Sequence, residues 1–277
     1  MRGLFPVKRA CTFVSTLALA SQLACRSTNS TLDVVGGTLV RSTDPIAAHT
    51  VALVETEGTL DEYCTGVLIA PNAILTAAHC FLETKKHPMI YFGNSIPKLR
   101  SKTNNRFVEF GEVIIHPDFS QKRLQDYDKK IRKLSDAAKI PLPKEGLDDL
   151  AIVLFQDPHL SDFSPVAMAK DLPGDEPTHA AGFGCQSTEC ETYSSKLRKV
   201  ALTFVKPLGE TDMLVLSAGE NRGTCTGDSG GPDFVTTSDG LKLLSIISTG
   251  PESCEAGISI ETRVSPYFEW IKSVTNQ

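Results

Sequence analysis

Short apolar runs separated by glycine, proline, asparagine and aspartate fill most of the chain from residue 34 onward. The runs are rich in β-branched residues and only a few residues long, which is typical of strands. They lie at residues 50–55, 65–70, 73–78, 107–116, 150–155, 199–205, 212–217 and 242–248. Because helical segments do not alternate regularly with these runs, the pattern predicts an antiparallel all-β sandwich or barrel.

Two segments carry a helical period instead. Across residues 121–140 the apolar positions are spaced alternately by three and four, which predicts an amphipathic helix with a basic outer face. Its apolar face contains Leu124, Tyr127, Ile131, Leu134 and Ala138. Pro141 and Pro143 end this helix, since a proline disfavours helical backbone in the residue before it. A shorter helix is predicted near the end of the chain, with one face formed by Tyr267, Trp270, Ile271 and Val274.

The first residues of the chain predict an export signal. A cationic start precedes an apolar stretch at residues 10–20 that is too short to span a bilayer. Two processing routes stay open: small residues at 18–20 suit an ordinary signal peptidase, whereas "SQLAC" resembles the site where bacterial lipoproteins are lipidated at cysteine, here Cys25. Residues 1–24 are therefore predicted as a signal peptide and 25–33 as a short pro-segment. Any membrane attachment is expected only through a lipid on Cys25.

Charge and cysteine content narrow the function classes. A net charge of -5 and a pI near 5.7 argue against nucleic acid as a partner. Beyond the N-terminal segments the cysteines form an even set that can pair fully in an oxidising compartment, which fits a secreted, periplasmic or cell-surface protein. The set is Cys64, Cys80, Cys185, Cys190, Cys225 and Cys254. No CxxC pair occurs, so neither a metal site nor another cofactor is predicted.

Three short motifs supply the parts of an activated serine nucleophile. "TAAHC" places His79 at the end of a strand, "LDDLAIV" places Asp148 and Asp149 before another, and "GDSGGP" places Ser229 among glycines. A serine hydroxyl needs a base, a group that orients the base, and donors for the oxyanion. Singly, each motif has a structural explanation: a core histidine, a turn aspartate and a glycine-rich turn. Together and in this order they favour catalysis.

The order of these residues excludes two kinds of hydrolase. Residues 227–231 also satisfy the G-x-S-x-G motif of α/β-hydrolases, but that fold needs a histidine after the serine. All six histidines of this chain precede Ser229. The subtilisin order of Asp, His and Ser would leave "TAAHC" unused. The order His79, Asp149, Ser229 is that of the chymotrypsin type.

With these motifs in this order, the chain resembles a trypsin/chymotrypsin-type serine endopeptidase of a bacterial-like exported form. The resemblance runs from "VVGG" at residues 34–37 to "YFEWI" at 267–271, and "LTAAHC" and "GDSGGP" are its most specific parts. It implies an all-β fold of two six-stranded antiparallel barrels within residues 34–277, divided near residues 156–170. It also implies protein or peptide substrates.

The resemblance also implies the role of each site residue. Ser229 is the nucleophile, His79 the base and Asp149 the group that orients the base, while the N–H groups of Gly227 and Ser229 form the oxyanion hole. Asp149 is preferred to Asp148 because the family motif reads Asp-aliphatic-Ala-aliphatic, as Asp149 to Ile152 do.

Activation is the next feature that the resemblance implies. Val34, freed as a new N-terminus, would pair its ammonium group with the carboxylate of Asp228. Family zymogens usually carry Lys or Arg before this point, but this chain has Asp33. The sequence therefore does not predict activation by a trypsin-like cut, and an activating protease that cuts after Asp33, or trimming from Arg26, stays open.

Disulfide pairing follows from the same resemblance. Cys64–Cys80 and Cys225–Cys254 match family bridges beside the catalytic histidine and the substrate pocket. Cys185 and Cys190 match no family pair and are expected to close a small loop together.

The sequence leaves two alternatives open for the specificity pocket. The resemblance places Gly223 at its floor, with Ser248 and Gly250 along it. A floor without charge predicts a neutral, mainly apolar side chain at P1, the residue whose carbonyl is attacked. Against this, a nearby carboxylate could select Lys or Arg; the candidates are Glu252, Glu255 and Glu261.

Other functions stay open beside the protease. The helix of residues 121–140 is an insertion before the catalytic aspartate, and it either borders the cleft as an access barrier or exosite, or is a solvated helix. A catalytically silent homologue acting as a binding module is the runner-up function, although such proteins typically lose a triad residue. An exported structural or adhesive protein would leave the motifs unexplained.

Overall fold

The structure is a computed structural model that describes residues 35–56, 61–83, 85, 87–98, 105–174, 177–190, 193–209 and 211–276. The predicted signal peptide (1–24), the pro-segment (25–33) with Cys25, and Val34 lie outside these residues. All described residues belong to one compact unit. No helix among them has both the length and the apolar composition needed to cross a bilayer.

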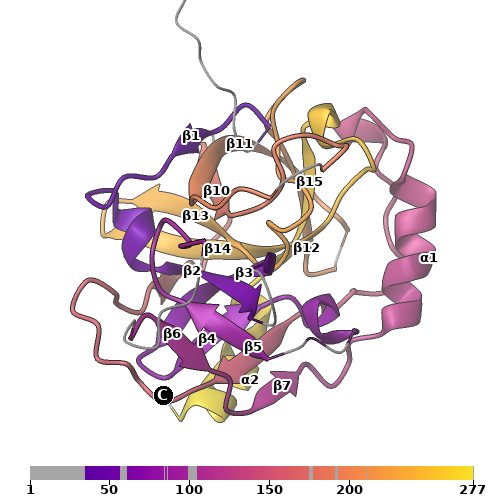
Figure 1. Ribbon diagram of the computed structural model, residues 1–277. Helices are drawn as coiled ribbons and strands as arrows, with labels where there is room; N and C mark the ends of the chain where they lie inside the picture. Colours follow the sequence, from indigo (N-terminus) through magenta and orange to yellow (C-terminus); the bar gives the residue numbers. More distant parts are fainter. Residues whose placement is uncertain are drawn as a thin grey trace, which may run out of the picture. The chain divides into compact units, whose positions relative to one another are not determined.

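Six strands of the second half of the chain close into an antiparallel barrel (Figure 1). They are β10 (Thr178–Gly182), β11 (Arg198–Pro207), β12 (Met213–Ser217), β13 (Pro232–Thr237), β14 (Gly240–Thr249) and β15 (Ile258–Arg263). The order is β11-β10-β13-β14-β15-β12, and β12 pairs back to β11, which closes the ring. Two short strands lie outside it: β1 (Thr38–Leu39) pairs with β11, and β9 (Ala167–Met168) pairs with β14.

The first half of the chain forms a seven-stranded sheet. Its strands are β2 (Thr50–Glu55), β3 (Asp61–Ala70), β4 (Ala73–Thr76), β5 (Pro88–Tyr91), β6 (Phe107–Glu109), β7 (Val113–Ile115) and β8 (Ala151–Leu154). They run in the order β6-β5-β2-β3-β4-β8-β7, and no pairing of described residues joins β6 to β7. The all-β, chymotrypsin-like fold is confirmed, but this half has seven short strands rather than six. Residues 155–166 connect the two sheets.

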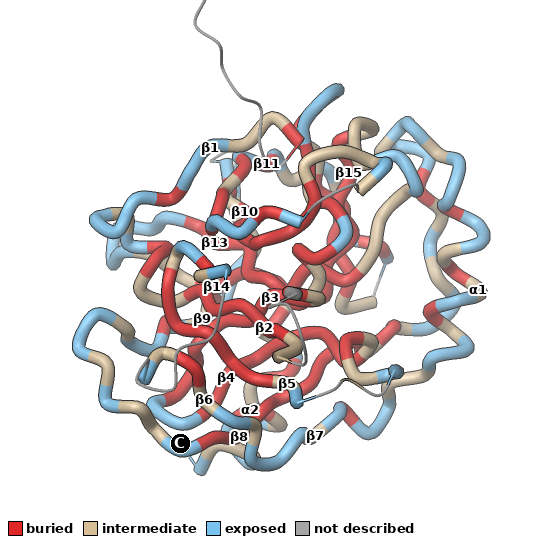
Figure 2. Tube along the Cα trace, in the orientation of Figure 1, coloured by how far each residue is buried: buried red, intermediate tan, exposed pale blue. Residues whose placement is uncertain are grey.

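The core explains why several strands read as continuous apolar runs. Val51 to Val54 of β2 are all fully buried, so this strand is covered on both faces. The same core cluster contains Phe183 and Phe234 from the other half, so the two sheets pack together. Figure 2 shows buried backbone through the centre and exposed residues in the connecting loops.

The predicted helix of residues 121–140 is shorter than expected. Helix α1 spans Gln121–Ile131, and its first turn is capped by the Ser120 hydroxyl, which accepts from the N–H of Arg123. After a turn, the 3₁₀ helix η3 (Ala137–Lys139) begins, with the Asp136 carboxylate accepting from the N–H of Ala138. Because an aspartate side chain competes with the backbone for such hydrogen bonds, Asp136 begins a separate helical turn instead of continuing α1.

Both helices pack by the face that the sequence predicts. In α1, Leu124, Tyr127 and Ile131 are buried and cluster with side chains of β12 and β15. In the sequence α1 lies between β7 and β8, two strands of the first sheet. In space it packs against the second sheet (Figure 1). The C-terminal helix α2 (Phe268–Thr275) follows the 3₁₀ helix η5 (Ser265–Tyr267) and buries Ile271. Further 3₁₀ helices are η1 (Pro45–Ala48), η2 (Ala78–Phe81) and η4 (Cys254–Ala256).

Candidate active site

His79 and Asp149 meet between two neighbouring strands of the first sheet. His79 lies in η2, directly after β4, and Asp149 lies directly before β8, which pairs with β4. The Nδ1 atom of His79 is 2.7 Å from Oδ2 of Asp149, and the backbone N–H of His79 donates to Oδ1 at 2.9 Å. Asp149 is fully buried. Its carboxylate therefore fixes both the ring and the backbone of His79 through these two contacts, away from water.

The backbone turns Asp148 away from this pair. Asp148 has a positive φ of 50°, and its carboxylate accepts from the Tyr267 hydroxyl at 2.8 Å and contacts Nη2 of Arg123 at 3.2 Å. Of the two neighbouring aspartates, only Asp149 therefore faces His79.

Ser248 supplies a contact that the sequence reasoning missed. Its hydroxyl donates to Oδ2 of Asp149 at 2.7 Å. The motif analysis placed Ser248 only along the specificity pocket, and nothing in the local sequence indicates a bond between residues 99 positions apart.

Burial and neighbouring charges shift the pKa values of His79 and Asp149. Burial lowers the pKa of His79, but the charge and hydrogen bond of Asp149, with the charge of Asp128, outweigh it and raise the pKa above its usual 6.5. Burial raises the pKa of Asp149, but His79 and the hydrogen bonds to the carboxylate hold it below its usual 3.8. The ring is therefore a stronger base than free histidine, and its partner stays ionised.

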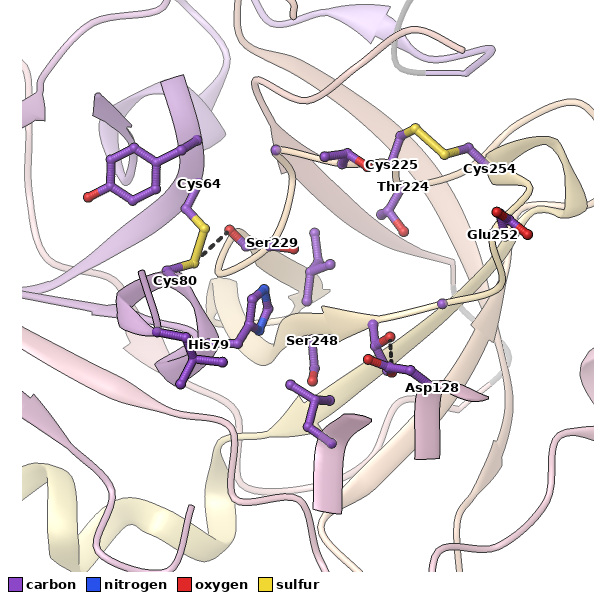
Figure 3. Close-up of a pocket in the computed structure, with 18 of the residues that line it drawn as sticks. Cys64, His79, Cys80, Asp128, Thr224, Cys225, Ser229, Ser248, Glu252 and Cys254 are labelled. Atoms are coloured by element: carbon purple, nitrogen blue, oxygen red, sulfur yellow. Dashed lines mark hydrogen bonds between the residues drawn. A yellow bond between two sulfur atoms is a disulfide. The ribbon is translucent and has the colours of Figure 1, made fainter. Parts of the chain in front are cut away.

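Ser229 lies in the loop before β13 and lines the same pocket as His79 (Figure 3). Thr65 of β3 holds this loop: its N–H donates to the Ser229 carbonyl at 2.8 Å, and its hydroxyl donates to the Gly227 carbonyl at 2.9 Å. From the other half, the Gly230 N–H donates to the Ile247 carbonyl at 2.8 Å. The serine loop is thus fixed by both sheets.

The peptide before Gly227 is oriented by the loop of residues 185–190. The carbonyl of Thr226 accepts from the N–H of Cys185 at 2.7 Å. Because C=O and N–H point in opposite directions across a trans peptide, the N–H of Gly227 points away from Cys185. Among the described residues, the N–H groups of Gly227 and Ser229 have no recorded acceptor.

Glycine is required at two positions of this loop. Gly227 has a φ of 93°, and an added Cβ would lie 2.9 Å from the Cα of Gly184. Gly230 has a φ of 77°, and its Cβ would lie 2.5 Å from the carbonyl oxygen of Thr65. Any side chain here would separate the loop from its neighbours.

Asp228 is buried beneath the same loop. Its carboxylate accepts from the N–H groups of Gly184 at 2.8 Å and Cys225 at 2.9 Å. Burial raises its pKa to about 6 despite these two bonds. Its predicted partner, Val34, lies outside the described residues, while the neighbouring Val35 is buried and its carbonyl accepts from Gly223 at 2.9 Å.

The pocket beside Ser229 contains two of the three residues expected for the specificity pocket. Ser248 and Gly250 line it, but Gly223 is buried and is not among the lining residues. The Thr224 hydroxyl lines the pocket and donates to Ser259 at 3.1 Å, and Ser259 donates to the carboxyl of Glu261 at 2.7 Å. Two hydroxyls in series therefore link this pocket to the fully buried carboxyl group of Glu261.

The three candidate carboxylates are all engaged. Arg132 donates to Glu252 at 3.0 Å, and the N–H of Thr188 donates to Glu255 at 3.1 Å. Glu261 also accepts from Ser245 at 2.6 Å, and burial raises its pKa to about 7.

The six cysteines form the three disulfides Cys64–Cys80, Cys185–Cys190 and Cys225–Cys254. Cys64, His79 and Cys80 are the one cluster of the described residues whose atoms lie close enough for a metal ion. Both sulfurs of that cluster are bonded to each other, so neither can act as a thiolate ligand.

Comparisons with known proteins agree with this geometry. The sequence profile of the family described as Trypsin matches residues 34–271. The chain belongs to the trypsin family of serine endopeptidases. Its relatives include mouse (Mus musculus) kallikrein 1-related peptidase b24, 30% identical with 76% of this chain and 79% of the relative covered. The renal glandular kallikrein of Mastomys natalensis is 31% identical, with 76% and 80% covered. CLIP domain-containing serine protease B4 of Anopheles gambiae is 28% identical, with 80% and 65% covered.

One expectation is corrected by these relatives. The trypsin-family relatives named above are animal proteins, so the bacterial-like character expected from the sequence is not supported. That expectation came from the stretch around Cys25, which lies outside the matched residues 34–271. The three disulfides of this trypsin-family chain fit an exported protein.

Proposed function

We propose that this chain hydrolyses peptide bonds with Ser229 as the nucleophile, His79 as the base and Asp149 as the group that orients the base. The observation that carries the proposal is the buried Asp149 carboxylate bound to the backbone N–H and the ring Nδ1 of His79, whose side chain lines the same pocket as Ser229. Ser229 Oγ attacks the peptide carbonyl as His79 takes its proton, and the amine leaves with that proton. Water then hydrolyses the acyl-enzyme by the same steps.

The oxyanion of each tetrahedral intermediate would be bound by the N–H groups of Gly227 and Ser229. The orientation of the Gly227 N–H supports this role, because the Thr226 carbonyl of the same peptide is held on the opposite side by Cys185. Donors fixed before the substrate arrives need no rearrangement as the negative charge develops.

The first expected outcome concerns pH. Protonated His79 cannot accept the serine proton, so kcat/KM should fall as the pH drops through a pKa above 6.5. Asp128→Asn removes one of the charges that raise this pKa and should move the acid limb to lower pH. The measurement is the pH profile of kcat/KM for both proteins between about pH 5 and 9. An acid limb at the same pH in both would contradict the influence of Asp128.

For the substrate, we propose a neutral P1 side chain. Gly223 contributes no charge, and Thr224, which lines the pocket beside Ser229, contributes a neutral hydroxyl. Glu261 lies behind Ser259, and its raised pKa favours the uncharged form up to near neutral pH. The alternative, Lys or Arg at P1, would require the amine to be attracted by ionised Glu261 through the two hydroxyls.

A peptide library tests the activity and the P1 preference together. Protein that starts at Val34 is incubated with mixed peptides, and the cut sites are read by mass spectrometry beside Ser229→Ala. Cuts after neutral residues that vanish in Ser229→Ala are expected. Cuts after Lys or Arg that are lost in Glu261→Gln would establish the alternative. No cleavage at all would contradict the protease function and favour the catalytically silent binding module.

Activation through the N-terminus is the next proposal. Freed Val34 would place its ammonium beside the buried Asp228 carboxylate, which has no cation partner among the described residues. Asp228→Asn should lower kcat/KM by about 100-fold in protein that starts at Val34, since removing one partner of a buried pair costs about 3 kcal/mol or more. In protein that keeps residues 25–33, where the ammonium is absent, the same change should have little effect. Equal losses in both proteins would contradict the pairing.

Export and domain limits complete the proposal. We propose residues 1–24 as a signal peptide, 25–33 as a pro-segment that a protease removes after Asp33 or from Arg26, and 34–277 as the protease domain with a boundary near 156–170. Lipid attachment at Cys25 would be detected as a mass shift that Cys25→Ser abolishes.

A further inference from the structure

Helix α1 forms one wall of the pocket that contains Ser229 and His79. Gln121, Leu124, Gln125 and Asp128, at helical spacings, all line it. Buried Leu124 and Tyr127 anchor the helix to the second sheet, and the Thr249 hydroxyl donates to Oδ1 of Asp128 at 2.7 Å. Figure 3 shows Asp128 at this bond, across the pocket from Cys225 and Cys254. The inserted helix is thus fixed against the pocket rather than solvated on all sides.

Asp128 differs from the other carboxylates of this pocket. Glu83 lies 3.4 Å from Nζ of Lys85, and Glu252 is bonded to Arg132. No Lys, Arg or other cation within salt-bridge distance of Asp128 is recorded in the described part of the chain. The Thr249 bond uses Oδ1, and no donor to Oδ2 is recorded there.

The neighbouring charges on the same helix point elsewhere. Lys129 is exposed and pairs with Asp126 at 3.2 Å, and Lys122 pairs with Asp126 as well. The charged groups that act on Asp128 are instead His79 and Asp149. A half-buried carboxylate without a counter-ion is unfavourable, and a cation brought by a ligand would offset that cost.

The location of Asp128 determines which part of a substrate it can meet. Thr249 follows Ser248 and precedes Gly250, which borders the P1 pocket. Asp128 is bonded to Thr249 on one side and lies close enough to His79 to influence its charge. A substrate whose P1 side chain enters the pocket must extend its preceding residues past this group.

We infer that Asp128 selects substrates with Lys or Arg in one of the two residues that precede P1, by binding the cationic side chain through its free carboxylate oxygen. This inference rests on the proposed endopeptidase function and makes Asp128 a specificity residue of the same site. An ammonium or guanidinium group would form a charge-assisted hydrogen bond there, partly shielded from water.

Matched peptides test the inference. All peptides have the same P1 residue, chosen from those at which the library is cut. They differ at one of the two preceding positions at a time, which carries Lys, Gln or Glu. The measured quantity is the ratio of kcat/KM for the Lys and Gln peptides within each protein, so that losses of overall activity cancel. Wild-type protein is expected to favour Lys by about 10-fold at one of these positions, the usual effect of a charged hydrogen bond.

Three variants separate recognition from general charge effects. Asp128→Asn keeps the size of the side chain and an acceptor for Thr249, and should bring the ratio close to one. Asp128→Lys should reverse the preference toward Glu. Asp126→Asn is the matched control, because it removes the same charge from the same helix at a position outside the pocket lining. It should keep the wild-type ratio.

The outcomes are distinguishable. A ratio close to one in the wild type, or a Lys preference that survives in Asp128→Asn, would overturn the inference while leaving the endopeptidase function in place. A ratio that falls equally in Asp126→Asn would also overturn it, because net charge would then explain the preference. Absence of any cleavage would contradict the protease function itself, and with it this inference.

Discussion

Replacing Ser229 by alanine is expected to lower kcat for peptide hydrolysis by about 10⁴-fold or more, the scale found when a triad member is removed from serine proteases. The change deletes the only oxygen that can form the acyl-enzyme in the proposed mechanism. The carbonyl of Ser229 and the N–H groups of its loop remain, so the bond from Thr65 and the oxyanion donors are kept. The residual rate would come from these donors and from substrate binding.

The measurement is steady-state hydrolysis of one cleaved peptide, together with labelling by a serine-directed phosphonylating reagent. Wild-type protein should gain one covalent adduct, and Ser229→Ala none. Thermal unfolding of both proteins is the control, because the hydroxyl has no recorded hydrogen bond among the described residues. A variant that keeps most of its kcat would contradict Ser229 as the nucleophile.

Asp149→Asn is expected to lower kcat by about 10⁴-fold near neutral pH. Asp149 accepts hydrogen bonds from the N–H of His79, the ring Nδ1 and the Ser248 hydroxyl. An asparagine has only one acceptor oxygen. Its amide nitrogen, which donates, would therefore face one of the groups that donate to Asp149 in the wild type. If that group is Nδ1, the ring must carry its proton on Nε2, and the base facing Ser229 is lost.

Asp148→Asn is the matched control, one residue away and with the same change in charge. Asp148 binds Tyr267 and Arg123 rather than His79, so this variant should lose some thermal stability but keep most of its kcat. The measurement is kcat at one pH for both variants, with melting temperatures beside it. If the two variants lost activity equally, Asp149 would have no special role in orienting His79.

The candidate site residues could be predicted from the sequence where they belong to short motifs. "TAAHC", "DLAIV" and "GDSGGP" each encode a local backbone shape, so His79, Asp149 and Ser229 can be found without knowing how distant strands pair. The C-terminal helix and the start of α1 were also predictable, since a 3.6-residue period and a serine cap act over a few residues. The early end of α1 was not expected, because Asp136 caps a separate helix there.

The unpredicted part depends on contacts between distant segments. Ser248 reaches Asp149, Thr249 reaches Asp128, and Thr224 reaches Ser259 only after β14 and β15 have taken their places in the barrel. Single residues with ordinary polar side chains carry no local signal of such partners. The motif around Ser229 predicted Gly223 for the specificity pocket, but it gave no indication of Thr224, which lines the pocket beside Ser229.

The double contact of Thr65 with the serine loop has a consequence for how activity arises during folding. Thr65 belongs to a strand of the first sheet, whereas Ser229 and Gly227 precede a strand of the second. A nascent chain with only its first half folded would hold His79 and Asp149 without the proposed nucleophile, and the second half alone would lack the hydrogen bonds from Thr65 to the loop of Ser229. Under the proposed mechanism hydrolysis therefore requires both halves, and newly made molecules would not cleave their neighbours before the two halves have joined.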